Sequence, residues 1–101
     1  MTYILVPEVD RDFEWDQTKS EWNRLERGLP FDLAILLFDG PTLERRDDRR
    51  DYGEARVRAI GHVGGVIPHC VYTDRGLARR IISLRHANRR ERDAYRAAFQ
   101  N

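Results

Sequence analysis

The stretch VIPHCVYTDRGLARRIISLRH, residues 66–86, is typical of a β-hairpin and decides the predicted fold. Two runs rich in apolar and β-branched residues, 66–73 and 77–86, flank the turn-forming sequence Asp74-Arg75-Gly76. Pro68 lacks a backbone donor, so we expect an edge position, a bulge or the start of a strand near it. This stretch therefore predicts two neighbouring antiparallel strands.

The segments before the hairpin extend the predicted sheet. Residues 54–63 alternate between apolar and charged side chains, and Gly64-Gly65 joins them to the hairpin as a two-residue turn. Residues 42–46 and the aromatic stretch 13–15 each predict a short strand, and 47–53 predict a polar loop.

Capping residues predict three helices. Asp16 is a favoured N-cap for a helix over 17–27 that Gly28 ends, with Trp22 and Leu25 on its apolar face. Asp32 precedes a second, very apolar helix over 33–38. Asn88 and Glu91 form a capping-box pattern that opens a final helix. The apolar face of this helix is formed by Ala94, Tyr95, Ala98 and Phe99.

These elements predict one α+β domain over residues 1–101. Two N-terminal helices pack on one face of an antiparallel β-sheet meander, a C-terminal helix follows, and the other face is free for a ligand. Residues 1–12 are an N-terminal extension in which Tyr3–Val6 could add an extra edge strand.

Composition excludes several classes of protein. Hydrophobic residues make up 41% of the chain, which is ordinary globular usage. No apolar run approaches the roughly 18 residues of a membrane span, and the N-terminus lacks the pattern of a signal peptide. Cys70 is the only cysteine, so we expect a reducing, cytoplasmic location and a buried core thiol.

The charges are unevenly distributed although the net charge is only +1. Of 18 basic residues 17 are arginines, and eight of these lie between Arg75 and Arg96 with two acids among them. In the last predicted strand, simple alternation puts Arg79 and Arg85 on one face and Arg80 and His86 on the other. These arginines are either solvated strand ends or an anion site. Guanidinium binds phosphate bidentately, and a helix opening at Arg89-Arg90 adds backbone donors.

Motifs for other chemistries are missing from the sequence. The three histidines occur singly, the lone cysteine fits no zinc spacing, and there is no GxSxG, GxxxxGK[ST] or GxGxxG. We interpret the Asp47-Asp48 pair, which lies among four arginines, as a solvated ion-pair network.

The remaining interpretation is phosphodiester chemistry without a metal or cofactor. RNA supplies its own nucleophile, the 2′-hydroxyl, and arginines can stabilise the charge that develops on phosphorus. The candidate proton carriers are His86, Glu54, Tyr95 and Lys19. Structural alternatives stay open for three of them: an ion-pair partner for Glu54, helix core for Tyr95 and a solvated helix residue for Lys19.

An ordered set of short motifs resembles one known family. The set is FEWD at 13–16, Lys19, Asn23, Gly28, Phe31-Asp32, FDGP at 38–41, YGEARV at 52–57, IG at 60–61, VYTDRG at 71–76, RIIS at 80–83, Arg85, Ala87, RRE at 89–91 and Tyr95. No piece is specific alone, but their order over 13–95 resembles that of BrnT-type ribonuclease toxins of type II toxin–antitoxin systems.

The resemblance implies a RelE-like fold and a metal-independent endoribonuclease that inhibits translation and growth. It also implies neutralisation by a BrnA-type ribbon-helix-helix antitoxin, through which the complex contacts operator DNA indirectly. The residues that it carries over are Lys19, Glu54, Arg56, Thr73, Arg80, Ser83, Arg85 and Tyr95.

Together with the analysis of the charges, this gives two sets of candidate site residues. The catalytic candidates are Arg80, Arg85, His86, Glu54, Lys19 and Tyr95. The candidates for binding RNA phosphate are Arg56, Arg79, Arg89, Arg90, Thr73 and Ser83.

Two other functions are compatible with the same residues. An inactive relative could act as a binding module and co-repressor in an antitoxin–operator complex. A small structural domain could use its arginines for solubility alone, and would then show no salt-dependent affinity for RNA.

Overall fold

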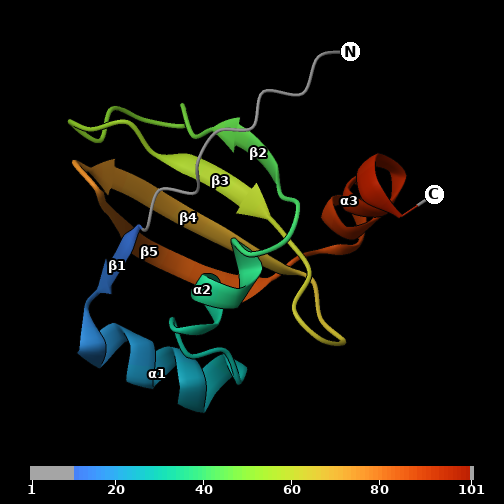
Figure 1. The fold of residues 1–101 in the computed structure, drawn as a ribbon, viewed down its shortest axis with the longest axis horizontal. Helices are drawn as coiled ribbons and strands as arrows, with labels where there is room; N and C mark the ends of the chain where they lie inside the picture. The colour runs from blue at the N-terminus through green and yellow to red at the C-terminus, as the bar shows by residue number, and fades with distance from the viewer. Residues whose placement is uncertain (1–10, 101) are drawn as a thin grey trace.

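The computed structural model describes residues 11–100 (Figure 1). The possible extra strand at Tyr3–Val6 lies outside the described residues. The elements in chain order are β1 (Asp12–Trp15), α1 (Gln17–Arg27), α2 (Leu33–Leu37), β2 (Leu43–Arg46), β3 (Val57–Ile60), β4 (Pro68–Arg75), β5 (Ala78–His86) and α3 (Arg89–Phe99).

The strands form a five-stranded sheet in the order β1-β5-β4-β3-β2. Strands β2 to β5 are an antiparallel meander, as predicted, but β1 runs parallel to β5 and pairs Glu14 with Arg80. The predicted meander did not include β1, and its parallel pairing with β5 was not predicted. A four-residue aromatic strand carries no sequence signal for its direction, and β1 joins the strand that is last in the chain.

Two boundaries differ from the prediction. Strand β3 covers only Val57–Ile60 of the predicted 54–63. Before its start, the Thr73 hydroxyl donates to the Ala55 carbonyl at 2.7 Å. The β4–β5 turn is also shorter than predicted: both Asp74 and Arg75 belong to β4, and Gly76, with φ of 62°, makes the turn.

A β-bulge in β5 overturns the predicted alternation of its side chains. Val71 pairs with Ser83 and Tyr72 with Ile81, so Ile82 is an extra residue between them. Because of this extra residue, the side chains of 78–81 lie on the opposite faces from those that simple alternation with 83–86 would give them. As a result Arg80, opposite Thr73, and Arg85, opposite His69, share one face. The prediction that Arg80 and Arg85 lie on opposite faces of the sheet is wrong. Arg85 and His86 do lie on opposite faces, as predicted.

The hydrophobic core lies mainly on the other face of the sheet, which we call the α2 face. Ala34 and Leu37 of α2 pack there against Cys70, Ile81 and Leu84 from the central strands. The buried thiol of Cys70 was predicted, and burial raises its pKa to about 12. The α2 helix thus covers one face of the sheet, and Figure 1 shows it in front of the strands.

A smaller core attaches helix α3 to the opposite face, which we call the α3 face. Tyr95 is buried against Ile67 and Ala87, with Leu43 and Ile60 packed beside them. The predicted capping box is confirmed, because the Asn88 side chain accepts from the Glu91 amide and the Glu91 carboxylate accepts from the Asn88 amide. Helix α3 leaves most of this face of the sheet uncovered (Figure 1).

Helix α1 is held by polar groups and not by the predicted apolar face. Trp22 and Leu25 are 54% and 68% exposed, whereas Ser20 and Asn23 are buried. The Asn23 amide donates to the carbonyl oxygens of Leu29 at 2.6 Å and Leu84 at 2.8 Å. A buried carbonyl without a donor costs about 1–3 kcal/mol, so this amide fixes α1 against the end of β5.

The helix limits themselves follow the sequence closely. Helix α1 has the predicted bounds, with the Asp16 side chain accepting from the Lys19 amide and Gly28 at φ of 70°. Asp32 precedes α2 but makes no side-chain capping bond, so its predicted role is wrong. None of the helices within residues 11–100 is long and apolar enough to cross a membrane.

Candidate functional site

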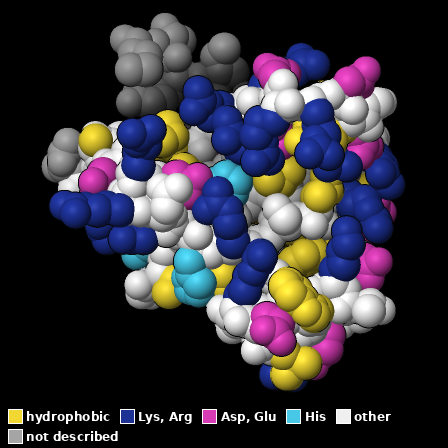
Figure 2. Space-filling view, turned by 180° about the vertical axis from the view of Figure 1, so that it is seen from behind, with side chains coloured by type: hydrophobic (Ala, Val, Ile, Leu, Met, Phe, Trp, Pro, Cys, Tyr) yellow, Lys and Arg dark blue, Asp and Glu magenta, His cyan; other side chains and the backbone are white. Residues whose placement is uncertain are grey.

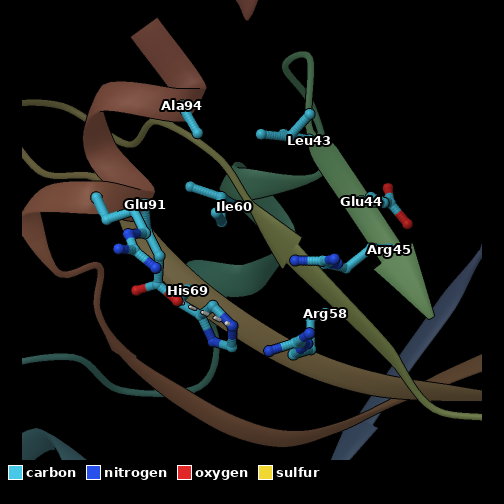
Figure 3. Close-up of a pocket in the computed structure, with 9 residues that line it drawn as sticks. Leu43, Glu44, Arg45, Arg58, Ile60, His69, Glu91 and Ala94 are labelled. Atoms are coloured by element: carbon cyan, nitrogen blue, oxygen red, sulfur yellow. Dashed lines mark ion pairs between the residues drawn. The ribbon is translucent and has the colours of Figure 1, made fainter. Parts of the chain in front are cut away.

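The α3 face carries a pocket of about 340 Å³ between strands β2 and β3, the start of β4 and helix α3. Seen from behind, the molecule shows many Lys and Arg side chains gathered over this side (Figure 2). The residues that line the pocket are Leu43, Glu44, Arg45, Arg58, Ile60, His69, Arg90, Glu91 and Ala94, and all are drawn as sticks in Figure 3.

Arg45 and Arg58 are cross-strand neighbours in the β2–β3 ladder, on the same face of the sheet. Within residues 11–100, neither forms an ion pair with a carboxylate, and the Nε of Arg58 is buried without a hydrogen-bond partner. Like charges directly opposite each other destabilise a sheet. Figure 3 shows both side chains extending into the pocket. This arrangement costs stability in the free protein and would be relieved by a bound anion.

Arg90 adds a third guanidinium to the lining of this pocket from the first turn of α3. Its side chain, too, has no ion pair with an acid in the described part of the chain. By contrast, the other five predicted site arginines are each paired to a carboxylate: Arg56 to Glu54 at 3.6 Å, Arg79 to Asp74 at 2.9 Å, Arg80 to Glu14 at 3.7 Å, Arg85 to Glu91 at 2.8 Å and Arg89 to Asp93 at 4.0 Å.

His69 lies at the inner end of the pocket with its side chain only 4% exposed. Its Nε2 is 3.6 Å from a carboxylate oxygen of Glu91, and its Nδ1 has no partner. Burial lowers the pKa of His69, with further lowering by the positive charges of Arg85 and Arg58, while Glu91 opposes them. The imidazole is therefore neutral at pH 7 and able to accept a proton.

Arg85 and Glu91 connect the last strand to helix α3 behind His69. Two parallel hydrogen bonds of 2.8 and 2.9 Å join the guanidinium to the carboxylate. These bonds, with a backbone bond from Asn88, lower the pKa of Glu91 to about 2. Glu91 thus stays ionised, holds Arg85 in place and faces the imidazole of His69.

Three other predicted residues lie further along the α3 face. Arg80 is a third exposed and only loosely paired with Glu14. The guanidinium of Arg56 lies 4.1 Å from the centre of the Tyr52 ring and 3.6 Å from Glu54. Thr73 is buried, and its hydroxyl is committed to a backbone carbonyl. The bulge thus brings Arg80 to the same face as Arg85, but Arg80 does not line the pocket.

The α2 face holds two predicted site residues that the structure does not bring to the pocket. Arg79 is half-buried: its guanidinium lies 3.9 Å from the centre of the Tyr72 ring and pairs with Asp74. The Nε2 of His86 lies 3.1 Å from the carbonyl oxygen of Arg27 at the end of α1. Arg79 and His86 thus contact other parts of the protein, and neither residue shares a cleft with Arg85.

The remaining candidates are scattered. Tyr95 is buried and donates to the Pro41 carbonyl at 2.9 Å, which is the helix-core role left open for it. Glu54 pairs with Arg75 at 3.2 Å, which is the ion-pair role left open for it. Arg89 is 90% exposed. Lys19 and Ser83 line a separate hollow of about 230 Å³ beside α1.

Sequence reasoning missed Arg45, Arg58 and His69 as members of one site. The sequence predicts that the arginines of 45–50 form a solvated ion-pair network with Asp47 and Asp48. The structure confirms ion pairs for Arg46 and Arg49, but Asp47 is buried and not solvated. Arg45 points to the other face of β2, a signal present in strict strand alternation. His69 was dismissed because no second metal ligand lay near it in sequence.

The pocket offers three guanidinium groups, a neutral imidazole and the carboxylates of Glu44 and Glu91, and no cluster of three His, Cys, Asp or Glu side chains that could hold a metal occurs within residues 11–100. Such a set fits the binding of an anion and the transfer of a proton beside it.

Comparison with known proteins identifies the family of the chain. No curated protein matches the chain. The family model described as "Ribonuclease toxin, BrnT, of type II toxin-antitoxin system" matches residues 15–91, a span that includes α1, α2, β2 to β5 and every side chain lining the pocket except Ala94. The chain belongs to this family of type II toxin–antitoxin ribonuclease toxins, the BrnT toxins.

Proposed function

We propose that the chain is a metal-independent endoribonuclease whose RNA lies across the α3 face with the scissile phosphate at Arg45 and Arg58. The observation that carries this proposal is the pair of arginines, which lie opposite each other and form no ion pair within residues 11–100, beside the buried neutral His69. Arg90 contributes a third positive charge, and Arg80 and Arg56 extend the positive surface for neighbouring phosphates. Arg85 binds the Glu91 carboxylate and so positions it beside His69.

The reaction uses the nucleophile that RNA carries. His69 accepts the proton of the 2′-hydroxyl, the 2′-oxygen bonds to phosphorus, and the bond from phosphorus to the 5′-oxygen breaks. The products are a 2′,3′-cyclic phosphate and a 5′-hydroxyl, with the leaving oxygen protonated by imidazolium or water. The guanidinium groups stabilise the charge on the phosphorane, which is the largest contribution in many enzymes.

Membership of a type II toxin family implies an antitoxin partner and an RNA substrate. We assign the finer points by the resemblance described above: a RelE-like fold, a BrnA-type ribbon-helix-helix antitoxin and action in the cytoplasm, where cleavage arrests growth. Operator DNA is then contacted through the antitoxin. The modest net charge of +1 agrees with a protein that has no general affinity of its own for duplex DNA.

Cleavage of purified RNA in excess EDTA tests this function. We expect the full chain to cut RNA without ribosomes and to leave 2′,3′-cyclic phosphate ends, and we expect affinity for RNA to fall steeply with salt. An RNA whose 2′-hydroxyls are replaced by hydrogen should bind and remain intact. Activity that appears only on addition of Mg²⁺, or cleavage of the 2′-deoxy substrate, would contradict the proposal.

A further inference from the structure

The pocket beside the proposed phosphate site has an apolar floor. Leu43 of β2, Ile60 of β3 and Ala94 of α3 form it, and Leu43 and Ile60 are packed onto the small core around Tyr95. Figure 3 shows these three side chains at one end of the pocket and the charged groups at the other. The pocket therefore has two chemically different ends.

The volume exceeds what a phosphate group needs. At about 340 Å³ the pocket lies within the roughly 300–1,000 Å³ range of sites that bind small molecules. A phosphate group has five heavy atoms and gains nothing from contact with Leu, Ile or Ala side chains. Ligand pockets that are mainly apolar with a few placed polar groups bind molecules of mixed character.

We propose that this pocket receives one nucleotide of the RNA, with its base against Leu43, Ile60 and Ala94 and its phosphate at the rim arginines. The proposal rests on the proposed function and adds a base-binding subsite to it. A flat ring covers the apolar floor, and the three guanidinium groups face the negative charge that every nucleotide carries next to its base. An apolar side chain of a protein partner would fill the floor but leave these guanidinium groups without a counter-charge.

The carboxylate of Glu91 and the imidazole of His69 lie at the boundary between the two ends. Both are held in place, Glu91 by Arg85 and the Asn88 amide, His69 by burial. Fixed polar groups beside a base distinguish bases by their donors and acceptors. This subsite therefore gives the enzyme a preference among the four bases at one position.

Titration of the full chain with mononucleotides tests the subsite without cleavage. The probes are the four nucleoside 5′-monophosphates and ribose 5-phosphate, which lacks a base. We expect at least one nucleotide to bind tenfold or more tightly than ribose 5-phosphate. The Ala94→Trp substitution, on the exposed side of α3, fills the floor and should reduce that nucleotide to the affinity of ribose 5-phosphate while leaving ribose 5-phosphate unchanged.

Gln100→Trp is the matched control, because it adds the same ring to the exposed, uncharged residue that follows α3, outside the pocket. Thermal melting shows whether each variant is folded, and Ala94→Phe replaces Ala94→Trp if the larger ring prevents folding. Equal affinity for all five probes, no binding of any, or normal nucleotide binding by folded Ala94 variants would overturn the subsite. RNA cleavage by the unsubstituted chain, measured in parallel, shows separately whether the proposed function stands.

Discussion

Arg45→Gln is expected to lower kcat/KM for RNA cleavage by about 10²–10³-fold, the usual loss when one group that stabilises transition-state charge is removed. Arg45 faces Arg58 across the β2–β3 ladder, and neither pairs with a carboxylate within residues 11–100. Both guanidinium groups are therefore free to bind the phosphorane. The same substitution removes a repulsion between like charges, so the melting temperature should stay the same or rise.

Arg46→Gln is the matched control, since Arg46 is the next residue of β2 and points to the other face, where it pairs with Asp48 at 2.9 Å. Loss of an exposed ion pair changes stability by at most about 1 kcal/mol, and cleavage should change less than twofold. Each variant changes the net charge by the same amount, so a difference between them reports position and not total charge. Equal cleavage by the two folded variants would remove Arg45 from the site.

His69→Gln is expected to reduce kcat/KM by about 10²–10⁴-fold, the usual contribution of a positioned proton carrier. The amide is close in size to imidazole and can occupy the same buried place, but it does not accept a proton near neutral pH. Melting of the variant separates loss of catalysis from loss of folding, because His69 is buried.

The dependence of RNA cleavage on pH tests the role of His69 more specifically. A base works when neutral, so cleavage should rise as pH increases through the pKa of His69 and then level off. Because burial, Arg85 and Arg58 lower this pKa against the opposing effect of Glu91, the rise should lie below pH 6.5, the ordinary value. His69→Gln should lose this limb of the profile. If the limb remains at the same pH in the folded variant, another group is the base.

The local parts of the fold could be predicted from sequence. The bounds of α1, the capping box at Asn88 and the turn at Gly64-Gly65 depend on residues close together in the chain, and each is confirmed. The parallel pairing of β1 with β5 is a contact between distant segments, which no short pattern specifies. The polar attachment of α1 was missed because burial of Asn23 depends on two carbonyl groups supplied by other parts of the fold.

In the candidate site, too, the local pattern could be predicted and the contacts between distant segments could not. A cluster of arginines between 75 and 96 was visible in the sequence, but which of them have acid partners depends on the tertiary structure. The bulge at Ile82 places Arg80 and Arg85 on one face, and a one-residue shift of this kind reverses every side chain beyond it. Arg45, Arg58 and His69 come from three strands, and only the register of the ladders brings them together.

The most direct measurement is a map of the RNA-binding surface by NMR, with the full chain and a short 2′-deoxy oligonucleotide that cannot be cleaved. We predict the largest changes in chemical shift at Arg45, Arg58, His69 and Arg90, and no change at the exposed ring of Trp22 on α1. Changes centred on Trp22 and the neighbouring surface of α1, with none around the pocket, would contradict it.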